Sequence, residues 1–116
     1  MHKLERSRLE ELEMLLDDLA AALKAGGHSE WAGVFGHFGY ELALVRGGRT
    51  VDPVELRRLV RNIRLCFDGS SGFPGLFLEG KDPGESAALN LSLTQLRART
   101  ARALDEINRR LIEFVN

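Results

Sequence analysis

The chain has 116 residues and a formal net charge of −1, with 44% hydrophobic and 28% charged residues. This is the length of one domain, spanning residues 1–116, with the composition of a globular rather than a disordered protein. A net charge near zero gives no overall field that would favour nucleic acid or an acidic membrane. The single cysteine excludes an internal disulfide and indicates a reducing compartment, and no stretch reaches the roughly 20 apolar residues of a membrane span. We therefore expect a cytoplasmic protein that does not insert into a membrane, and the bias toward Leu, Ala, Gly and Arg is typical of bacteria.

The first half of the chain predicts two helices. The first is expected over residues 3–25, and its leucines recur at spacings of three and four, which places on one face Leu9, Leu12, Leu16, Leu19 and Leu23. Glycines 26 and 27 are expected to end it with a left-handed cap. The second is expected over residues 29–46, with Ser29 as its N-cap and an apolar face formed by Trp31, Val34, Phe35, Phe38, Leu42 and Val45. Gly36 and Gly39 share a row beside this face. Because each glycine lowers the stability of a helix by about 1 kcal/mol relative to alanine, the pair indicates that another backbone approaches closely there.

Two D-P-x-E motifs, at residues 52–55 and 82–85, mark the starts of two further helices. In the third helix, residues 53–67, Asp52 is expected to cap and Glu55 to close a capping box, while the inward positions are Leu56, Leu59, Val60, Ile63 and Phe67. The last helix, residues 84–115, would span roughly 45 Å, with inward positions Leu89, Leu93, Leu96, Thr100, Ala103, Ile107, Leu111 and Phe114. Because it is longer than its neighbours, it either kinks or reaches past the bundle toward a partner. These elements predict an all-α, four-helix bundle with a long ordered Gly/Pro-rich connection between its third and fourth helices.

That connection, residues 68–84, carries an unusual number of large apolar side chains for a loop: Phe73, Leu76, Phe77 and Leu78. Left in water, they would form an exposed apolar patch that soluble monomers avoid, whereas burial would contribute about 1.5–3 kcal/mol for each. Pro74-Gly75 is typical of a type II turn. The segment is therefore either a structural lid folded onto the bundle or a binding surface, and Phe73, Leu76 and Phe77 are the candidate partner-binding residues.

The order of a helix with Trp31 near its start, a helix leading into "DGSSGFPGLFL", and a final helix resembles a family of small uncharacterised bacterial helical proteins. That family carries a loop pattern like G-G-M-G-S-F-N-D-L, and the positions that match it are Gly69, Phe73 and Leu76. This chain departs from the pattern with Asp68 in place of the first glycine and Pro74-Gly75 in place of Asn-Asp. The resemblance covers about half of the chain. It implies a helical fold without an established activity, and an immunity-protein-like or antitoxin-like role by association.

Arginines give the third helix a basic face. Arg57, Arg61 and Arg64 share one side of that helix, and residues 46–64 hold six arginines against two acids. Such a face fits an acidic protein surface or a phosphate group; the alternative is that these arginines are solvated and pair with acids of the first helix. Nucleic acid is not favoured as a partner, because no aromatic residue is interleaved to stack on bases.

Residues suited to catalysis occur without the rest of a known constellation. His37 and Glu41 stand four residues apart, a spacing that brings two metal ligands together, but no third ligand follows at a suitable spacing. The acids of the first helix resemble those of all-α nucleotide pyrophosphohydrolases, with Met14 where the third acid of that motif stands. Cys66 is more typical of a small buried hydrophobe than of a nucleophile. We therefore assign no catalytic residue, no metal site and no cofactor.

The sequence favours a non-enzymatic protein–protein interaction module, regulatory or immunity-like, that binds a protein partner or a second copy of itself as a homodimer. A rival hypothesis is a small-molecule or nucleotide-binding helical protein, or an all-α hydrolase, with a pocket lined by Trp31, His37 and Tyr40. A third hypothesis is nucleic-acid binding through the arginine face of the third helix.

Overall fold

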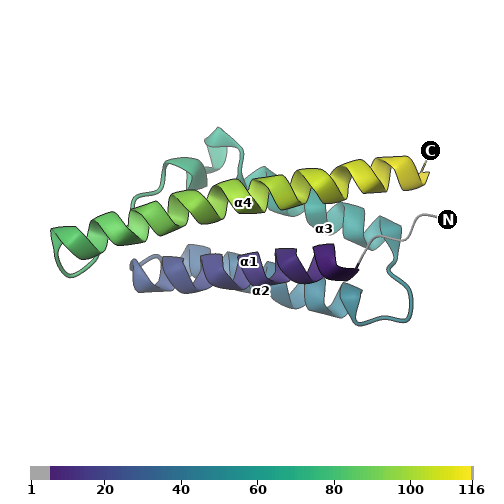
Figure 1. Cartoon of the computed structure of the whole chain (residues 1–116), viewed down its shortest axis with the longest axis horizontal. Coiled ribbons are helices and arrows are strands. Elements are labelled where there is room, and N and C mark those ends of the chain that lie inside the picture. Colours follow the sequence, from purple (N-terminus) through teal and green to yellow (C-terminus); the bar gives the residue numbers. More distant parts are fainter. Residues whose placement is uncertain (1–5, 116) are drawn as a thin grey trace.

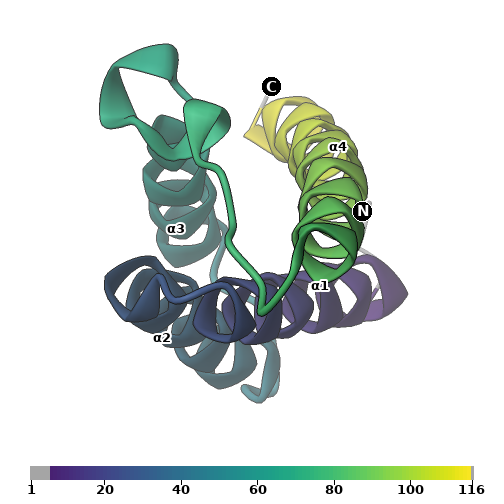
Figure 2. The same cartoon turned by 90° about the vertical axis from the view of Figure 1, so that its left-hand side faces the viewer.

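The structure, a computed structural model, describes residues 6–115, with side chains from residue 6 to residue 112. It contains four α-helices: α1 (Arg6–Ala25), α2 (Ser29–Arg46), α3 (Pro53–Cys66) and α4 (Pro83–Val115). Two short 3-10 turns, η1 (Gly69–Ser71) and η2 (Phe73–Gly75), lie between α3 and α4, and the described residues contain no strand. Both α1 and α3 pack against α2 and against α4, so the four helices enclose one core (Figures 1 and 2). The prediction of an all-α bundle is confirmed.

The turn between α1 and α2 contains the predicted left-handed glycine, but the N-cap residue of α2 differs from the prediction. Gly27 has a φ of 84°, and the amide of His28 donates to the carbonyl of Leu23 at 2.8 Å, which closes the expected left-handed cap. This turn leads directly into α2, so Ser29 is already helical and His28 occupies the N-cap position without a side-chain cap bond. The prediction of Ser29 as the N-cap is therefore wrong.

Both D-P-x-E motifs begin helices. The Asp52 carboxylate accepts from the amide of Val54 at 2.9 Å, and the Asp82 carboxylate accepts from the amide of Glu85 at 2.8 Å. Glu55 does not close a capping box, because its carboxylate binds Arg58 at 2.6 Å instead. The helix starts are confirmed, and the reciprocal contact expected from Glu55 is not formed.

The core is built mainly from leucines. All five leucines predicted for the inner face of α1 are fully buried, and Leu15 joins them because α1 lies between α2 and α4 and buries a broader face than one stripe. The predicted inner positions of α3 and α4 are buried as well, apart from the half-buried Phe67 and Leu89, and Leu104 is an addition. Val34 is the exception on α2, since it lies at the surface. The predicted residues 3–5 and the Phe114 side chain lie outside the described part of the chain.

The two glycines on the expected close-packed row have different surroundings. A Cβ atom at Gly39 would lie 2.8 Å from the Asp17 carboxylate, so α1 is the close neighbour that this glycine admits. A Cβ atom at Gly36 would meet nothing within 4 Å. The expectation of close backbone approach therefore holds within this chain for Gly39 and not for Gly36.

α4 is much longer than the helix beside it, and this mismatch sets the position of the connection. α4 has 33 residues and α3 has 14. Figure 1 shows α3 lying beside the C-terminal half of α4 only, while the N-terminal turns of α4 extend past the ends of α1 and α2. Residues 67–82, which we call the strap, run along the half of the bundle that α3 leaves open, and they descend to the start of α4 in Figure 2.

Candidate interaction surface

Phe73 is the central residue of the strap, and it lies in the core. Its side chain is fully buried, and its ring centroid lies 4.7 Å from that of Phe35, 5.2 Å from Trp31 and 5.4 Å from Phe67. This aromatic cluster occupies the space that further turns of α3 would otherwise fill. Phe73 was predicted to bind a partner; that prediction is corrected, because burial within the chain leaves none of its surface accessible.

Arg97 of α4 fixes the backbone beside Phe73. One guanidinium nitrogen, Nη1, donates to the carbonyls of Phe73 and Pro74 at 2.9 Å each, and the guanidinium carbon lies 5.7 Å from the Phe73 ring centroid. Burial lowers the pKa of Arg97. The expected type II turn does not form: the Leu76 amide donates to the Phe73 carbonyl in a 3-10 turn, and the left-handed residue is Gly72, with a φ of 87°.

The second half of the strap is held on both sides. Leu78 is fully buried, and the Asn90 side chain binds both its amide and its carbonyl at 2.8 Å. The Gly80 amide donates to Ser86 Oγ at 2.9 Å, and His28 Nε2 lies 3.0 Å from the Phe77 carbonyl oxygen. The strap is thus an ordered cover. It is bound to α4 through Phe73, Pro74, Leu78 and Gly80, and to the start of α2 through Phe77.

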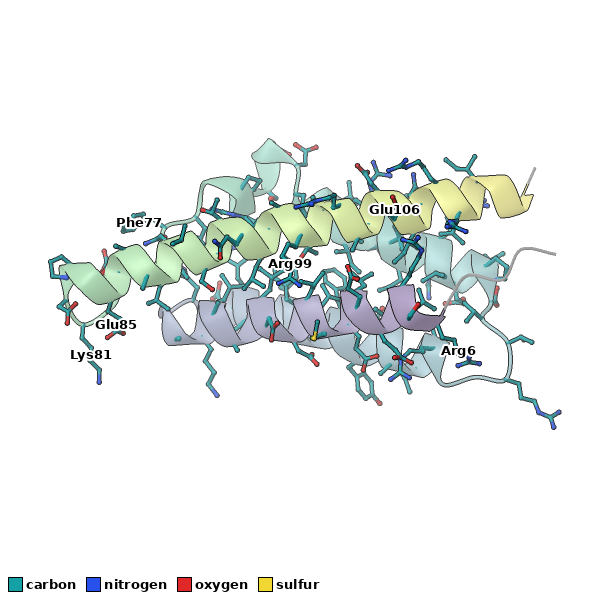
Figure 3. The ribbon with its side chains drawn as sticks, in the orientation of Figure 1. Arg6, Phe77, Lys81, Glu85, Arg99 and Glu106 are labelled. Carbon is teal, nitrogen blue, oxygen red and sulfur yellow. The ribbon has the colours of Figure 1, made fainter. Side chains whose placement is uncertain are left out.

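The remaining two candidate residues of the strap differ in exposure. Leu76 is half-buried against the core, whereas Phe77 leaves 63% of its surface exposed. Figure 3 shows Phe77 beside the N-terminal half of α4, outside the helical ribbons. Because Leu78 points inward, Phe77 points outward from the same extended backbone. Of the three strap residues predicted to bind a partner, Phe77 alone presents most of its side chain to solvent.

The predicted arginine face is exposed on α3. Arg57, Arg61 and Arg64 all lie at the surface, and Arg64 approaches the Asp105 carboxylate of α4 at 3.8 Å. Arg57 and Arg61 take part in none of the ion pairs formed within residues 6–112. The acids of α1 pair with a different arginine, since Glu13 binds Arg46 at 2.7 Å. The alternative that α1 neutralises this face therefore does not apply to Arg57 and Arg61.

Two exposed apolar residues of α3, neither of them a predicted contact residue, lie on either side of these arginines. Val54 and Leu65 leave 72% and 59% of their surface exposed. The signal was present in the sequence, because neither residue falls on the helical stripe of Leu56, Leu59, Val60 and Ile63 that enters the core. We call the outward residues of this helix the α3 surface: Val54, Arg57, Arg58, Arg61 and Leu65.

The three residues expected to line a pocket are not brought together. Trp31 packs inward against Phe35 and Phe73, whereas His37 and Tyr40 lie at the surface. Nine residues separate Trp31 from Tyr40, which places them on opposite sides of α2. A shallow depression of about 310 Å³ lies instead at the other end of α2, lined by Leu44, Val45, Gly48, Thr50, Asp52 and Glu55. The structure thus offers no support for the predicted pocket.

The residues weighed for catalysis occupy ordinary structural positions. His37 Nε2 binds the Glu41 carboxylate at 2.6 Å, and no group of three or more His, Cys, Asp or Glu residues in the described chain is arranged to hold a metal ion. Arg46 Nε donates to the Glu13 carboxylate at 2.7 Å, and this hydrogen bond raises the pKa of that guanidinium. Burial also raises the pKa of the Cys66 thiol, which lowers its nucleophilic thiolate fraction at neutral pH.

Comparison of the chain with protein-family models, with curated proteins and with solved structures gave no match in any of the three. Within residues 6–115, none of the helices combines the length and the apolar character needed to cross a membrane.

Proposed function

We propose that this chain is a non-enzymatic, cytoplasmic protein-interaction module that binds an acidic protein through its α3 surface. The observation that carries this proposal is the pair Arg57 and Arg61, exposed and without an ion pair in the described structure, between the exposed side chains of Val54 and Leu65. Arginine beside apolar residues is typical of the energetically important part of protein interfaces. An immunity-like or antitoxin-like role is the form of this function that the family resemblance implies.

The spacing of the arginines suggests what the partner presents. Arg57 and Arg61 are one helical turn apart, so their guanidinium groups can each meet one of two carboxylates similarly spaced on a partner helix. Val54 and Leu65 lie further out along the same helix, where they can contact apolar residues that flank those carboxylates. Phe77 of the strap, with the half-buried Leu76 beside it, is the second candidate contact.

A labelled helical peptide with two glutamates one turn apart and a leucine on each side tests this proposal by fluorescence anisotropy. We expect the double substitution Arg57→Glu/Arg61→Glu to weaken binding at least about tenfold, because opposite charges become like charges across the contact. The matched control is Arg99→Glu/Arg102→Glu, which makes the same change of charge at two exposed positions of α4. Equal losses in the two variants would show that net charge, and not the α3 surface, governs binding.

The two rival functions are outcomes of the same series of measurements. Thermal stabilisation by a nucleotide with Mg²⁺, and not by the peptide, would favour a nucleotide-binding protein or hydrolase. Affinity for duplex DNA that falls steeply with salt and is lost in Arg57→Glu/Arg61→Glu would favour nucleic-acid binding. Either result, without peptide binding, overturns the interaction module.

A further inference from the structure

α2 exposes several large apolar residues on its outward face. The residues that point directly away from the bundle are spaced by four, three and four positions, and we call them the outward stripe: Gly33, His37, Tyr40 and Leu44. Tyr40 and Leu44 leave 63% and 62% of their surface exposed, and the partly exposed Val34 lies beside them. Large apolar side chains gathered on one exposed face indicate an interaction surface. One side of α2 is uncovered in the single chain.

Two glycines at the N-terminal end of this face have no explanation within the chain. Gly33 and Gly36 both have negative φ, and a Cβ atom at either position would meet nothing within 4 Å. Glycine is the poorest helix former apart from proline, so an unneeded glycine in mid-helix weakens the fold. Gly39 of the same helix is explained, because it lies against Asp17. The open space at Gly33 and Gly36 is therefore accessible to a partner from outside the chain.

We propose that a second copy of this chain packs on the outward stripe, with the two α2 helices antiparallel about a two-fold axis. The spacing of four, three and four is that of a coiled-coil seam. In the antiparallel register centred between Phe38 and Gly39, Leu44 of each copy lies opposite Gly33 of the other, and Tyr40 lies opposite His37. The large side chains at one end of the stripe then fill the space left by glycine at the other end.

The polar groups on this face are complementary under the same symmetry. His37 Nε2 binds Glu41 at 2.6 Å within the chain, and between Trp31 and Val45 the sequence of α2 contains no other His, Asp, Glu, Lys or Arg. In the proposed register, His37 of each copy lies next to Glu41 of the other, so the two pairs form one alternating cluster at the centre of the contact. The antiparallel arrangement also sets the positive end of each helix dipole beside the negative end of the other.

One exposed apolar residue of α1, Met14, is level with part of the stripe. Glu13 of α1 binds Arg46 of α2, and Asp17 lies against Gly39, so the exposed Met14 between them is level with the Tyr40–Leu44 end of α2. An isologous contact requires one patch that matches itself when rotated. A stripe with glycine at one end, large apolar residues at the other and the paired His37 and Glu41 in the middle meets this requirement, which favours a second copy over an unrelated partner.

Sedimentation equilibrium from about 5 to about 500 µM tests the association, since a small helix–helix interface is expected to be weak. We expect a monomer–dimer equilibrium in the wild type and at least about a tenfold loss of affinity in Leu44→Glu. Gly33→Gln is the sharper variant: it should raise the thermal midpoint of the monomer, because glutamine is the better helix former, and yet weaken the dimer. Ala98→Gln, at an exposed position of α4, is the matched control and should leave the dimer unchanged.

Cysteine cross-linking tests the orientation. In a Cys66→Ser background, oxidation of a mixture of the His37→Cys and Tyr40→Cys variants should give the mixed disulfide in preference to either symmetric one. Symmetric disulfides in preference would overturn the antiparallel register. A wild type that stays monomeric throughout, or a dimer that survives both Leu44→Glu and Gly33→Gln, would overturn the surface itself. The variant Arg57→Glu/Arg61→Glu should dimerise as the wild type does, which separates this inference from the proposed function.

Discussion

The side chain of Asn90 binds Leu78 through both backbone groups of that residue. Asn90 Oδ1 accepts from the Leu78 amide and Asn90 Nδ2 donates to the Leu78 carbonyl, each at 2.8 Å. Nδ2 also donates to the carbonyl of Ser86, one turn earlier in α4, at 2.7 Å. The Asn90 side chain thus supplies the backbone hydrogen bonds that an extended segment normally makes with a neighbouring strand.

Asn90→Ala should therefore release the second half of the strap. The change leaves the buried amide and carbonyl of Leu78 without these partners, and we expect a loss of about 1–3 kcal/mol in the free energy of unfolding. Urea denaturation measures the loss, and hydrogen exchange should show faster exchange of the Leu78 amide. Asn62→Ala, at an exposed position of α3, is the control and should change stability little. Unchanged exchange at Leu78 in Asn90→Ala would show that burial of its side chain alone holds the strap.

Gly26 should tolerate no side chain, because the strap lies directly on it. A Cβ atom there would lie 2.7 Å from Leu78 Cδ2 and 2.8 Å from Leu78 Cβ, so rotation of the leucine does not relieve the contact. We expect Gly26→Ala to cost about 1–3 kcal/mol through overpacking. Gly36→Ala, measured at a concentration where the chain is monomeric, should instead stabilise by about 0.5–1 kcal/mol, since its Cβ meets nothing. Thermal denaturation of the pair checks the prediction, and shifts of the same sign would contradict it.

Thr100 places a hydroxyl group in the core of the bundle. The residue is fully buried, and its Oγ1 has no hydrogen-bond partner among the described residues. Thr100→Val keeps the shape and removes the unpaired polar group, so we expect about 1 kcal/mol of added stability. Thr94→Val is the control, because Thr94 is exposed and its hydroxyl already binds the Asn90 carbonyl at 2.9 Å. A destabilised Thr100→Val would mean that the hydroxyl is satisfied in solution.

Asp68 should make the first turn of the strap sensitive to acid. Its carboxylate accepts from the Ser70 amide at 3.0 Å and from the Ser70 hydroxyl at 3.1 Å, and these bonds lower the pKa of Asp68 below its ordinary value of 3.8. A carboxyl group whose pKa is lower in the folded than in the unfolded protein stabilises the folded state at pH values above its pKa in the unfolded chain. This stabilisation is lost as the pH falls through its pKa in the folded protein.

Urea titrations at a series of acidic pH values should therefore show a smaller loss of stability below about pH 4 in Asp68→Asn than in the wild type. Asparagine keeps an oxygen acceptor for the Ser70 amide but does not titrate in this range. Ser70→Ala, which removes only the hydroxyl bond, should lie between the two. Identical acid profiles for all three proteins would rule out this carboxylate as a contributor.

Local sequence patterns were sufficient to predict the four helices, most of their inward residues and the starts of α3 and α4. Leucines at spacings of three and four, glycine at the left-handed cap and Asp-Pro at two helix starts act within a few residues of chain. Their effects are local, and α1 to α4 formed almost as those patterns predicted. The apolar side chains of the strap likewise predicted that this segment would be covered and not left exposed to water.

Which strap residues are buried and which remain at the surface depends on long-range contacts. Phe73 and Phe77 have the same side chain and stand four residues apart, yet one fills the core and the other lies outside it. That difference follows from the short length of α3, the aromatic cluster that replaces its missing turns, and the anchors Arg97 and Asn90 on α4. These contacts join residues far apart in the chain, and no local pattern encodes the distance between them.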